Sequence, residues 1–278
     1  MAEPLETLAS RAVEGDRSAL DDLVAGLQGR VYNLALRMLW HPEDAEDATQ
    51  EILIKIVVNL ASFRGESSLR TWALRIAANH LLHVRRSRVE AQQLTFRGFA
   101  ADLERGLSDP PAAAADDPEQ RLLEREVKIG CTHAMLLCLD REHRLAYIVG
   151  EIFQLHHEEA AEILGILPAA FRKRLSRARI RIRSFMSEHC GLVSAKAACR
   201  CSGRVAAAVA TGRVDPRRLL FVTSTAPEER RGEAEAAEMD ELHRIAAIYR
   251  GHPEYAAPAR IANAVRELLK SGQYRVLQ

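Results

Sequence analysis

The stretch HHEEAAEILGILPAAFRKRLSRARIRIRSF, residues 156–185, indicates most directly how this chain folds. A short amphipathic segment ends at Gly165, and Pro168 then opens a second helical pattern, at a position where proline is favoured. The apolar residues of the second segment recur at helical spacing: Phe171, Leu175, Ala178 and Ile182. We therefore predict two helices joined by a tight turn, which is a helix-turn-helix motif.

The other face of the second predicted helix is strongly basic. It carries Arg172, Lys173, Arg174, Arg177, Arg179, Arg181 and Arg183. A helix of this kind can enter the DNA major groove, with its first turns at base edges and its outer cations at phosphates. A solvated charged face is the simpler alternative, but it does not explain why nearly all the charges have one sign.

Composition favours an all-α protein built from small domains. The chain has 278 residues, of which 47% are hydrophobic, 28% charged and 5% aromatic, and its net charge of +1 averages acidic and basic stretches that lie far apart. No secretory signal or membrane-spanning apolar run is evident. Five cysteines are an odd number, and without an export signal this favours reduced thiols over a disulfide framework. We therefore expect a cytoplasmic protein.

Further helices follow from apolar periodicity. We predict two helices between Leu20 and Val58 that are separated at His41–Pro42, a third over residues 69–84, and others over 119–139 and 141–153. The expected inward residues of the first two are Leu23, Leu27, Val31, Leu34, Ile52, Ile56 and Leu60. Trp72 is also expected in a core, since it shares helical spacing with Leu69 and Ile76, and a platform on which a base stacks is the alternative. Residues from about 98 to 118 show no sustained periodicity, which is typical of a linker.

The end of the chain predicts two closing helices. In the first, four apolar residues share a face: Met239, Leu242, Ile245 and Tyr249. The second runs from about Pro258 to Lys270.

Three motifs together resemble the extracytoplasmic-function (ECF) sigma factors of the sigma-70 family. They are DAEDATQEILIKI at 44–56, FRGESSLRTWALRIAANHLL at 63–82 and EEAAEILGILPAAFRKRLSRAR at 158–179. The resemblance covers residues 10–188 and implies two small helical domains, sigma-2 and sigma-4, joined by a flexible linker. Such a protein binds core RNA polymerase, directs it to minus-ten and minus-thirty-five promoter elements and assists strand opening, without being an enzyme.

The resemblance also sets the expected domain boundaries and partners. The ranges are 10–95 for sigma-2, 96–118 for the linker, 119–188 for sigma-4, 189–232 for a cysteine-bearing connector and 233–278 for a helical C-terminal extension. The expected partners are core polymerase and promoter DNA, and an anti-sigma factor is a candidate partner.

By position, the family's core-binding residues correspond to Asp44, Asp47, Gln50 and Glu51. Acidic and amide side chains suit docking on a basic partner surface. Stabilisation of the helix N-terminus by the same acids is an alternative that also applies.

The resemblance places the pocket for an extruded minus-ten base at Arg64, Gly65, Glu66, Ser67, Ser68 and Asn79. Glycine allows close backbone approach, while serine and asparagine can hydrogen-bond an unstacked base. An ordinary loop with a serine helix cap is the alternative. Candidate phosphate contacts nearby are Arg70, Arg75, Arg85, Arg86 and Arg88.

In the helix-turn-helix, the resemblance places Arg172, Lys173, Ser176 and Arg177 nearest the minus-thirty-five bases. Arg174 and Arg179 would then contact phosphates.

A cysteine cluster follows the basic helix. His189, Cys190, Cys199 and Cys201 lie within a short stretch and could bind zinc or copper(I), or form a disulfide on oxidation. Unligated thiols on a flexible connector are the alternative, whereas Cys131 and Cys138 are expected in a core. No cofactor is required by the sigma-factor interpretation. We hypothesise that the closing helices dock on the sigma domains and that the cysteine segment regulates this docking.

Two rival functions are weaker. His157–Glu158 suggests a zinc hydrolase, but Ala161 stands where the second histidine of HExxH belongs. A stand-alone helix-turn-helix regulator would explain residues 157–183 but leave the motifs at 44–82 without a role.

Overall fold

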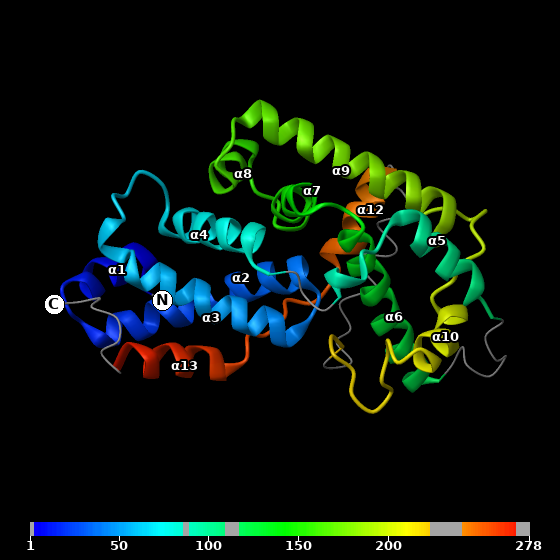
Figure 1. Ribbon diagram of the computed structural model, residues 1–278, viewed down its shortest axis with the longest axis horizontal. Coiled ribbons are helices and arrows are strands. Elements are labelled where there is room, and N and C mark those ends of the chain that lie inside the picture. The colour runs from blue at the N-terminus through cyan, green and yellow to red at the C-terminus, as the bar shows by residue number, and fades with distance from the viewer. Residues whose placement is uncertain (1–2, 86–88, 109–116, 223–240, 271–278) are drawn as a thin grey trace. The chain divides into compact units, whose positions relative to one another are not determined.

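The structure is a computed structural model that describes residues 3–85, 89–108, 117–222 and 241–270. Every regular element in these ranges is a helix, apart from one isolated β-bridge between Cys190 and Cys199 (Figure 1). The predicted all-α fold class is thus confirmed. None of the helices in the described ranges is both long and apolar enough to cross a membrane.

The second and third helices begin where the sequence provides a capping side chain. α1 spans Leu5–Val13, α2 spans Arg17–Leu39 and α3 spans Pro42–Val58. Asp16 caps α2, since its Oδ1 accepts hydrogen bonds from Ser18 N at 2.9 Å and Ala19 N at 3.1 Å. Pro42 occupies the start of α3, as predicted.

The remaining elements follow in this order: η1 (Leu60–Ser62), α4 (Leu69–His83), η2 (Glu90–Gln92), α5 (Phe96–Arg105), α6 (Pro118–Leu137), α7 (Arg141–Tyr147), the π-helix η4 (Ile148–Ile152), α8 (His157–Leu164), α9 (Pro168–His189), η5 (Ser202–Arg204), α10 (Val205–Ala210), α12 (Glu241–Arg250) and α13 (Ala259–Lys270).

Residue contacts divide the chain into two compact units. Unit 1 comprises Met1–Gln92, Leu155–Lys173 and Glu254–Gln278, and unit 2 comprises Gln93–Gln154 and Arg174–Pro253. The division falls within α9 and therefore differs from the sequence-based boundaries, which stay a prediction.

The core of unit 1 is built from α2, α3 and α4. The predicted inward residues Leu23, Leu27, Val31, Leu34, Ile52, Ile56 and Leu60 are all at most 3% exposed. α8 packs on α4, where Thr71 Oγ1 donates a hydrogen bond to Glu159 Oε1 at 3.0 Å. These contacts confirm the helical periodicity and bring the first helix of the helix-turn-helix beside α4.

The C-terminal segment is also part of unit 1. α13 runs along α3 (Figure 1), with Ile261 2% and Val265 0% exposed. Just before it, Asn33 of α2 binds the backbone of Tyr255 in both directions: Asn33 Nδ2 donates to Tyr255 O at 2.8 Å, and Tyr255 N donates to Asn33 Oδ1 at 3.0 Å. The part of the extension that begins at Glu254 is therefore integrated into the packing of α2 and α3.

Unit 2 is organised around α6 and α9. The rings of Phe96 and Phe99, on α5, lie 5.3 and 5.4 Å from that of Phe185 on α9. The ring of Tyr249 on α12 meets that of Tyr147 at 5.2 Å. Aromatic contacts thus hold both α5 and α12 in this unit.

Several elements differ from the sequence predictions. α5 forms within the range expected to be a linker, because the amphipathic Phe96–Arg105 segment buries Phe99 and Leu103. Leu242 is 41% exposed and does not share the buried face of Ile245 and Tyr249. Helix α1 and the short helices η5 and α10 were not predicted. Three residues singled out from the sequence, Arg86, Arg88 and Met239, lie outside the described ranges.

Candidate nucleic-acid interface

The loop before α4, residues 64–68, has a defined conformation at its glycine turn and at the serine that caps the helix. Gly65 has φ +71°, a left-handed conformation that glycine adopts without strain. Ser68 caps α4, as its Oγ accepts a hydrogen bond from Thr71 N at 3.0 Å. The cap interpretation of the serine is thus confirmed. Arg64, Gly65, Glu66 and Ser68 are exposed and Ser67 is half-buried, so this loop presents a preformed polar surface.

Trp72 lies next to this loop but is only half-buried, in contrast to the expected core position. Its ring meets that of Phe63 at 5.5 Å, with the two planes tilted by 55°. The residue therefore packs at the surface beside the loop rather than inside the helical core.

A groove lies between α3 and α4. It brings together Glu51, predicted to bind polymerase, with Asn79 and Arg85, predicted to bind DNA. Sequence reasoning missed its remaining lining residues: Lys55, Asn59, Ile76, His80, His83 and Val84. Lys55 could have been noticed because it stands one helical turn after Glu51.

His80 is the most constrained side chain of this groove. Its Nδ1 lies 2.7 Å from Lys55 Nζ, and because an ammonium group has no lone pair, Nδ1 must accept that hydrogen bond. The ring proton then lies on Nε2, 3.7 Å from Glu51 Oε2. Burial and the neighbouring Lys55 charge lower the pKa of His80. The neutral imidazole is therefore the favoured form in the folded protein.

The residues predicted to bind core polymerase lie on α3. Asp47 and Glu51 are exposed one turn apart, while Asp44 and Gln50 are half-buried. His41 caps the start of this helix, because its Nδ1 accepts a hydrogen bond from Asp44 N at 3.4 Å. The exposed acidic surface of α3 therefore consists mainly of Asp47 and Glu51.

The helix-turn-helix has the predicted local geometry. α8 ends at Gly165, which has φ +63°, and α9 begins at Pro168. The predicted inward residues Phe171, Leu175, Ala178 and Ile182 are at most 1% exposed. The residues of α9 that were predicted to contact bases are all exposed: Arg172, Lys173, Ser176 and Arg177.

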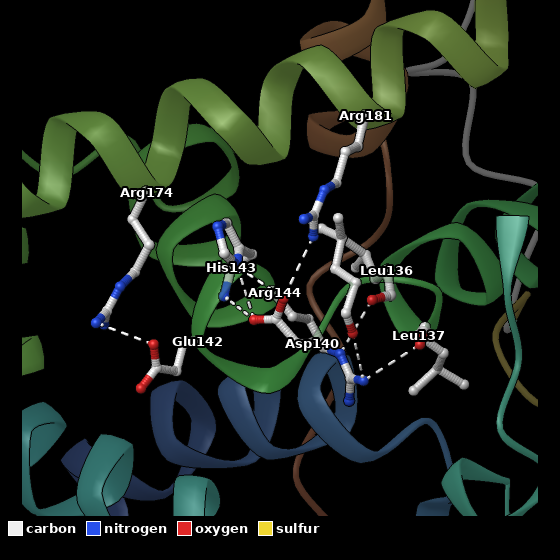
Figure 2. A network of polar contacts seen from close by, with 9 residues as sticks. Leu136, Leu137, Asp140, Glu142, His143, Arg144, Arg174 and Arg181 are labelled. Atoms are coloured by element: carbon white, nitrogen blue, oxygen red, sulfur yellow. Dashed lines mark hydrogen bonds and ion pairs between the residues drawn. The ribbon is translucent and has the colours of Figure 1, made fainter.

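Two other cations of α9, Arg174 and Arg181, are held in ion pairs (Figure 2). Arg174 Nη2 lies 3.0 Å from Glu142 Oε2, and Arg181 Nη1 lies 3.3 Å from Asp140 Oδ2. Asp140 also accepts hydrogen bonds from His143 N at 3.0 Å and has its carboxylate 2.7 Å from His143 Nδ1. The basic face is therefore divided into an exposed part and a part neutralised by acids at α7.

Arg179 shares a buried acid with the C-terminal extension. Glu151, only 7% exposed, accepts a hydrogen bond from Arg179 Nε at 2.7 Å. The same residue binds Arg250 of α12, whose Nε donates to Glu151 O at 2.8 Å and whose Nη2 lies 3.5 Å from Glu151 Oε2. Arg174 and Arg179, predicted to contact phosphates, are thus both ion-paired in this structure.

The cysteine segment lines a cavity in unit 2. His189, Cys190, Cys199 and Cys201 all border it, and so does Cys131, which was expected to be an ordinary core residue. Burial raises the pKa of the Cys201 thiol to about 12 and also raises the pKa of Cys131. Within the described ranges, no three His, Cys, Asp or Glu side chains are arranged to hold a metal ion.

With this geometry in place, comparisons with known proteins identify the class. Residues 23–90, which include α3, α4 and most of α2, match the family model for sigma-70 region 2. RNA polymerase sigma factor YlaC of Bacillus subtilis is 33% identical over 172 residues, covering 62% of this chain and 94% of that protein. ECF RNA polymerase sigma factor SigW of the same organism is 30% identical, covering 61% and 90%.

The chain therefore belongs to the ECF RNA polymerase sigma factors of the sigma-70 family. Among solved structures, CnrH in complex with the cytosolic domain of CnrY is similar, with 23% identity, a TM-score of 0.45 and coverage of 65% of this chain and 96% of that chain. The match to YlaC covers 62% of this chain, so more than a third of the chain lies outside it.

Proposed function

We propose that this sigma factor binds core RNA polymerase through α3, centred on Asp47 and Glu51, with Asp44 and Gln50 beside them. The observation in support is that Asp47 and Glu51 are exposed, whereas Ile52 and Ile56 of the same helix are buried in the core. Carboxylates on a rigid helix can pair with a basic partner surface and fix its register.

Promoter recognition then falls to two surfaces. The loop residues Arg64 to Ser68, with Asn79, Arg85 and Arg86, take the minus-ten strand, and Arg86 lies outside the described ranges. Arg172, Lys173, Ser176 and Arg177 of α9 take the minus-thirty-five bases. The single observation that carries this proposal is that the predicted base-reading residues of α9 are all exposed beside a fully buried apolar stripe.

Arg174 and Arg179 act as secondary phosphate contacts in this proposal. Each would exchange its carboxylate partner for a DNA phosphate on binding, because both are charge-assisted contacts of the same kind. The protein performs no bond chemistry and is not an enzyme. It works in the cytoplasm with core polymerase and promoter DNA, and an anti-sigma factor remains a predicted partner.

The C-terminal extension modulates this activity. Arg250 of α12 and Arg179 of α9 share Glu151, so the extension is directly linked to one proposed phosphate contact. Displacement of α12 would alter how tightly Glu151 retains Arg179.

Transcription in vitro tests the main proposal. Full-length protein and core polymerase are incubated with a genomic promoter library, and promoter-specific transcripts are expected. Arg172→Ala should reduce transcription from promoters that carry the base contacted by Arg172. The expected loss of DNA-binding free energy is about 1 to 3 kcal/mol for that base contact. Arg183→Ala is the matched control, because Arg183 is exposed further along the same helix.

The variant Asp47→Ala/Glu51→Ala separates polymerase binding from DNA binding. Co-elution with core polymerase should weaken, whereas DNA binding by the sigma factor alone should not. DNA binding without any transcripts or polymerase complex would instead favour a stand-alone helix-turn-helix regulator.

A further inference from the structure

Most of the chain's cysteines gather around one cavity. The chain contains five cysteines, and Cys131, Cys190, Cys199 and Cys201 line the same cavity in unit 2. Cys131 lies on α6, Cys190 directly follows α9, and the last two precede η5. Only Cys138 is not part of this lining. Such a gathering from segments far apart in the sequence is not expected from packing alone.

The rest of the lining is mainly apolar and includes Phe99, Leu103, Met135, Phe185 and Met186. The cavity volume is about 30 Å³. This volume can hold one ion, but it is too small for an organic molecule. All four thiols are free in this structure.

The segment from Cys190 to Arg204 is held by hydrogen bonds and by the ion pair of Arg204 with Asp102, but it buries little apolar surface. Cys190 and Cys199 form an isolated bridge in which Gly191 N donates to Cys199 O at 3.0 Å. Apart from Gly203, its buried residues are Ala197 and Arg204. Short irregular segments with so little buried apolar surface are commonly stabilised by a metal or disulfides.

We infer that Cys131, Cys190, Cys199 and Cys201 bind one thiophilic divalent metal ion, zinc, with four thiolate ligands. Four sulfur ligands suit tetrahedral zinc, and zinc with four cysteines is a common structural site. Binding releases the thiol protons to solvent and leaves the metal in its divalent state. The ion would fasten the connector after α9 to α6.

Binding requires the thiols to converge, because within the described ranges no group is already arranged to hold an ion. Each cysteine side chain has one rotatable bond before its sulfur, so rotamer changes move the thiol without unfolding the helix. A zinc ion with four thiolates carries net negative charge. Lys128 and Arg204, which line the same cavity, can offset that charge.

His189 is not a ligand in this proposal, although the sequence suggested it. Its ring lies against that of Phe185, with centroids 4.8 Å apart, and its Nε2 lies 3.7 Å from Glu188 Oε2. Cys131 replaces it as the fourth ligand. This assignment distinguishes the structural proposal from one based on the spacing of residues 189–201.

Metal binding to the full-length protein tests the inference. Reduced, metal-free protein is titrated with Co²⁺, and the intense visible absorption of tetrahedral thiolate-bound cobalt is expected at about one ion per chain. Addition of Zn²⁺ should abolish that absorption. Failure of the wild-type protein to develop it, or to retain zinc after gel filtration, would overturn the proposal.

Variants test the ligand set. Cys131→Ser should weaken zinc affinity at least about tenfold and reduce the cobalt absorption, as should Cys199→Ser. Cys138→Ser is the matched control and should bind like wild type, as should His189→Gln. Equal loss in Cys138→Ser and Cys131→Ser would refute the assignment, as would wild-type binding by Cys131→Ser. Circular dichroism of each variant verifies that the helices are retained.

Discussion

The attachment of the C-terminal segment to α2 depends on one asparagine. Asn33 is 9% exposed, and its side-chain amide forms both hydrogen bonds with the backbone of Tyr255. Its Oδ1 also accepts a hydrogen bond from Arg37 Nη1 at 2.7 Å, and Arg37 lies 4.8 Å from the centroid of the Tyr255 ring. Asn33→Ala removes this connection and leaves the surrounding apolar contacts in place.

The expected loss follows from the groups that lose their partners. Tyr255 is 8% exposed, so its backbone N–H and C=O would stay largely shielded from water. Leaving a buried polar group without its hydrogen bond costs about 1 to 3 kcal/mol. With two such groups and partial rehydration, we expect unit 1 to lose roughly 2 to 4 kcal/mol of its free energy of unfolding.

Urea denaturation followed by tryptophan fluorescence can measure this loss. The two tryptophans, Trp40 and Trp72, both lie in unit 1, so the signal reports that unit. The free energy is obtained from the midpoint and the slope of the transition. Hydrogen exchange in α13 provides a second readout and should accelerate in Asn33→Ala.

Asn59→Ala is the control. The Asn59 side chain donates to Lys55 O at 2.7 Å on the exposed end of its own helix, so its removal should change stability by less than about 0.5 kcal/mol. If Asn33→Ala matched this control in both denaturation and hydrogen exchange, the segment around Tyr255 would not be anchored through Asn33, and the reasoning would be refuted.

Three further predictions concern the proposed DNA-binding surfaces and the groove. Glu142→Gln should strengthen DNA binding by up to about 1 kcal/mol, measured by fluorescence anisotropy, because Arg174 then has no carboxylate to leave; Glu158→Gln, an exposed acid on α8, should not. Gly65→Ala should destabilise unit 1 by about 1 to 2 kcal/mol because of the positive φ, although the added Cβ meets open space. Gly29→Ala, within α2, should instead stabilise it by about 1 kcal/mol; equal effects in urea denaturation would contradict the backbone argument. Folding lowers the pKa of His80 below its ordinary value of 6.5. At a pH below 6.5 the unfolded chain therefore binds a proton at His80 more readily than the folded chain does. The free energy of unfolding should fall as the pH drops from 6.5 toward the pKa of the folded protein. His80→Gln should flatten this part of the stability profile, whereas exposed His83→Gln should preserve it; an unchanged profile in His80→Gln would exclude His80 as the source.

Local patterns in the sequence determined the helices of this protein. Apolar residues recur with the period of a helix, and that period depends only on neighbouring positions, so the inward residues Leu23, Ile52 and Phe171 could be predicted. Starts and ends were equally readable where their signals are local, as at Pro42, Ser68 and Gly165. The three motifs also predicted the family.

Contacts between segments far apart in the sequence were decided only by the tertiary structure. The acids that neutralise Arg174 and Arg179 come from α7 and η4, so the sequence alone suggested a uniformly basic helix. Cys131 joined the other thiols because α6 packs beside the segment after α9, although its own helix predicted an ordinary core position. The period of one helix fixes which face is buried, but it carries no information about which charge or thiol another helix brings to that face.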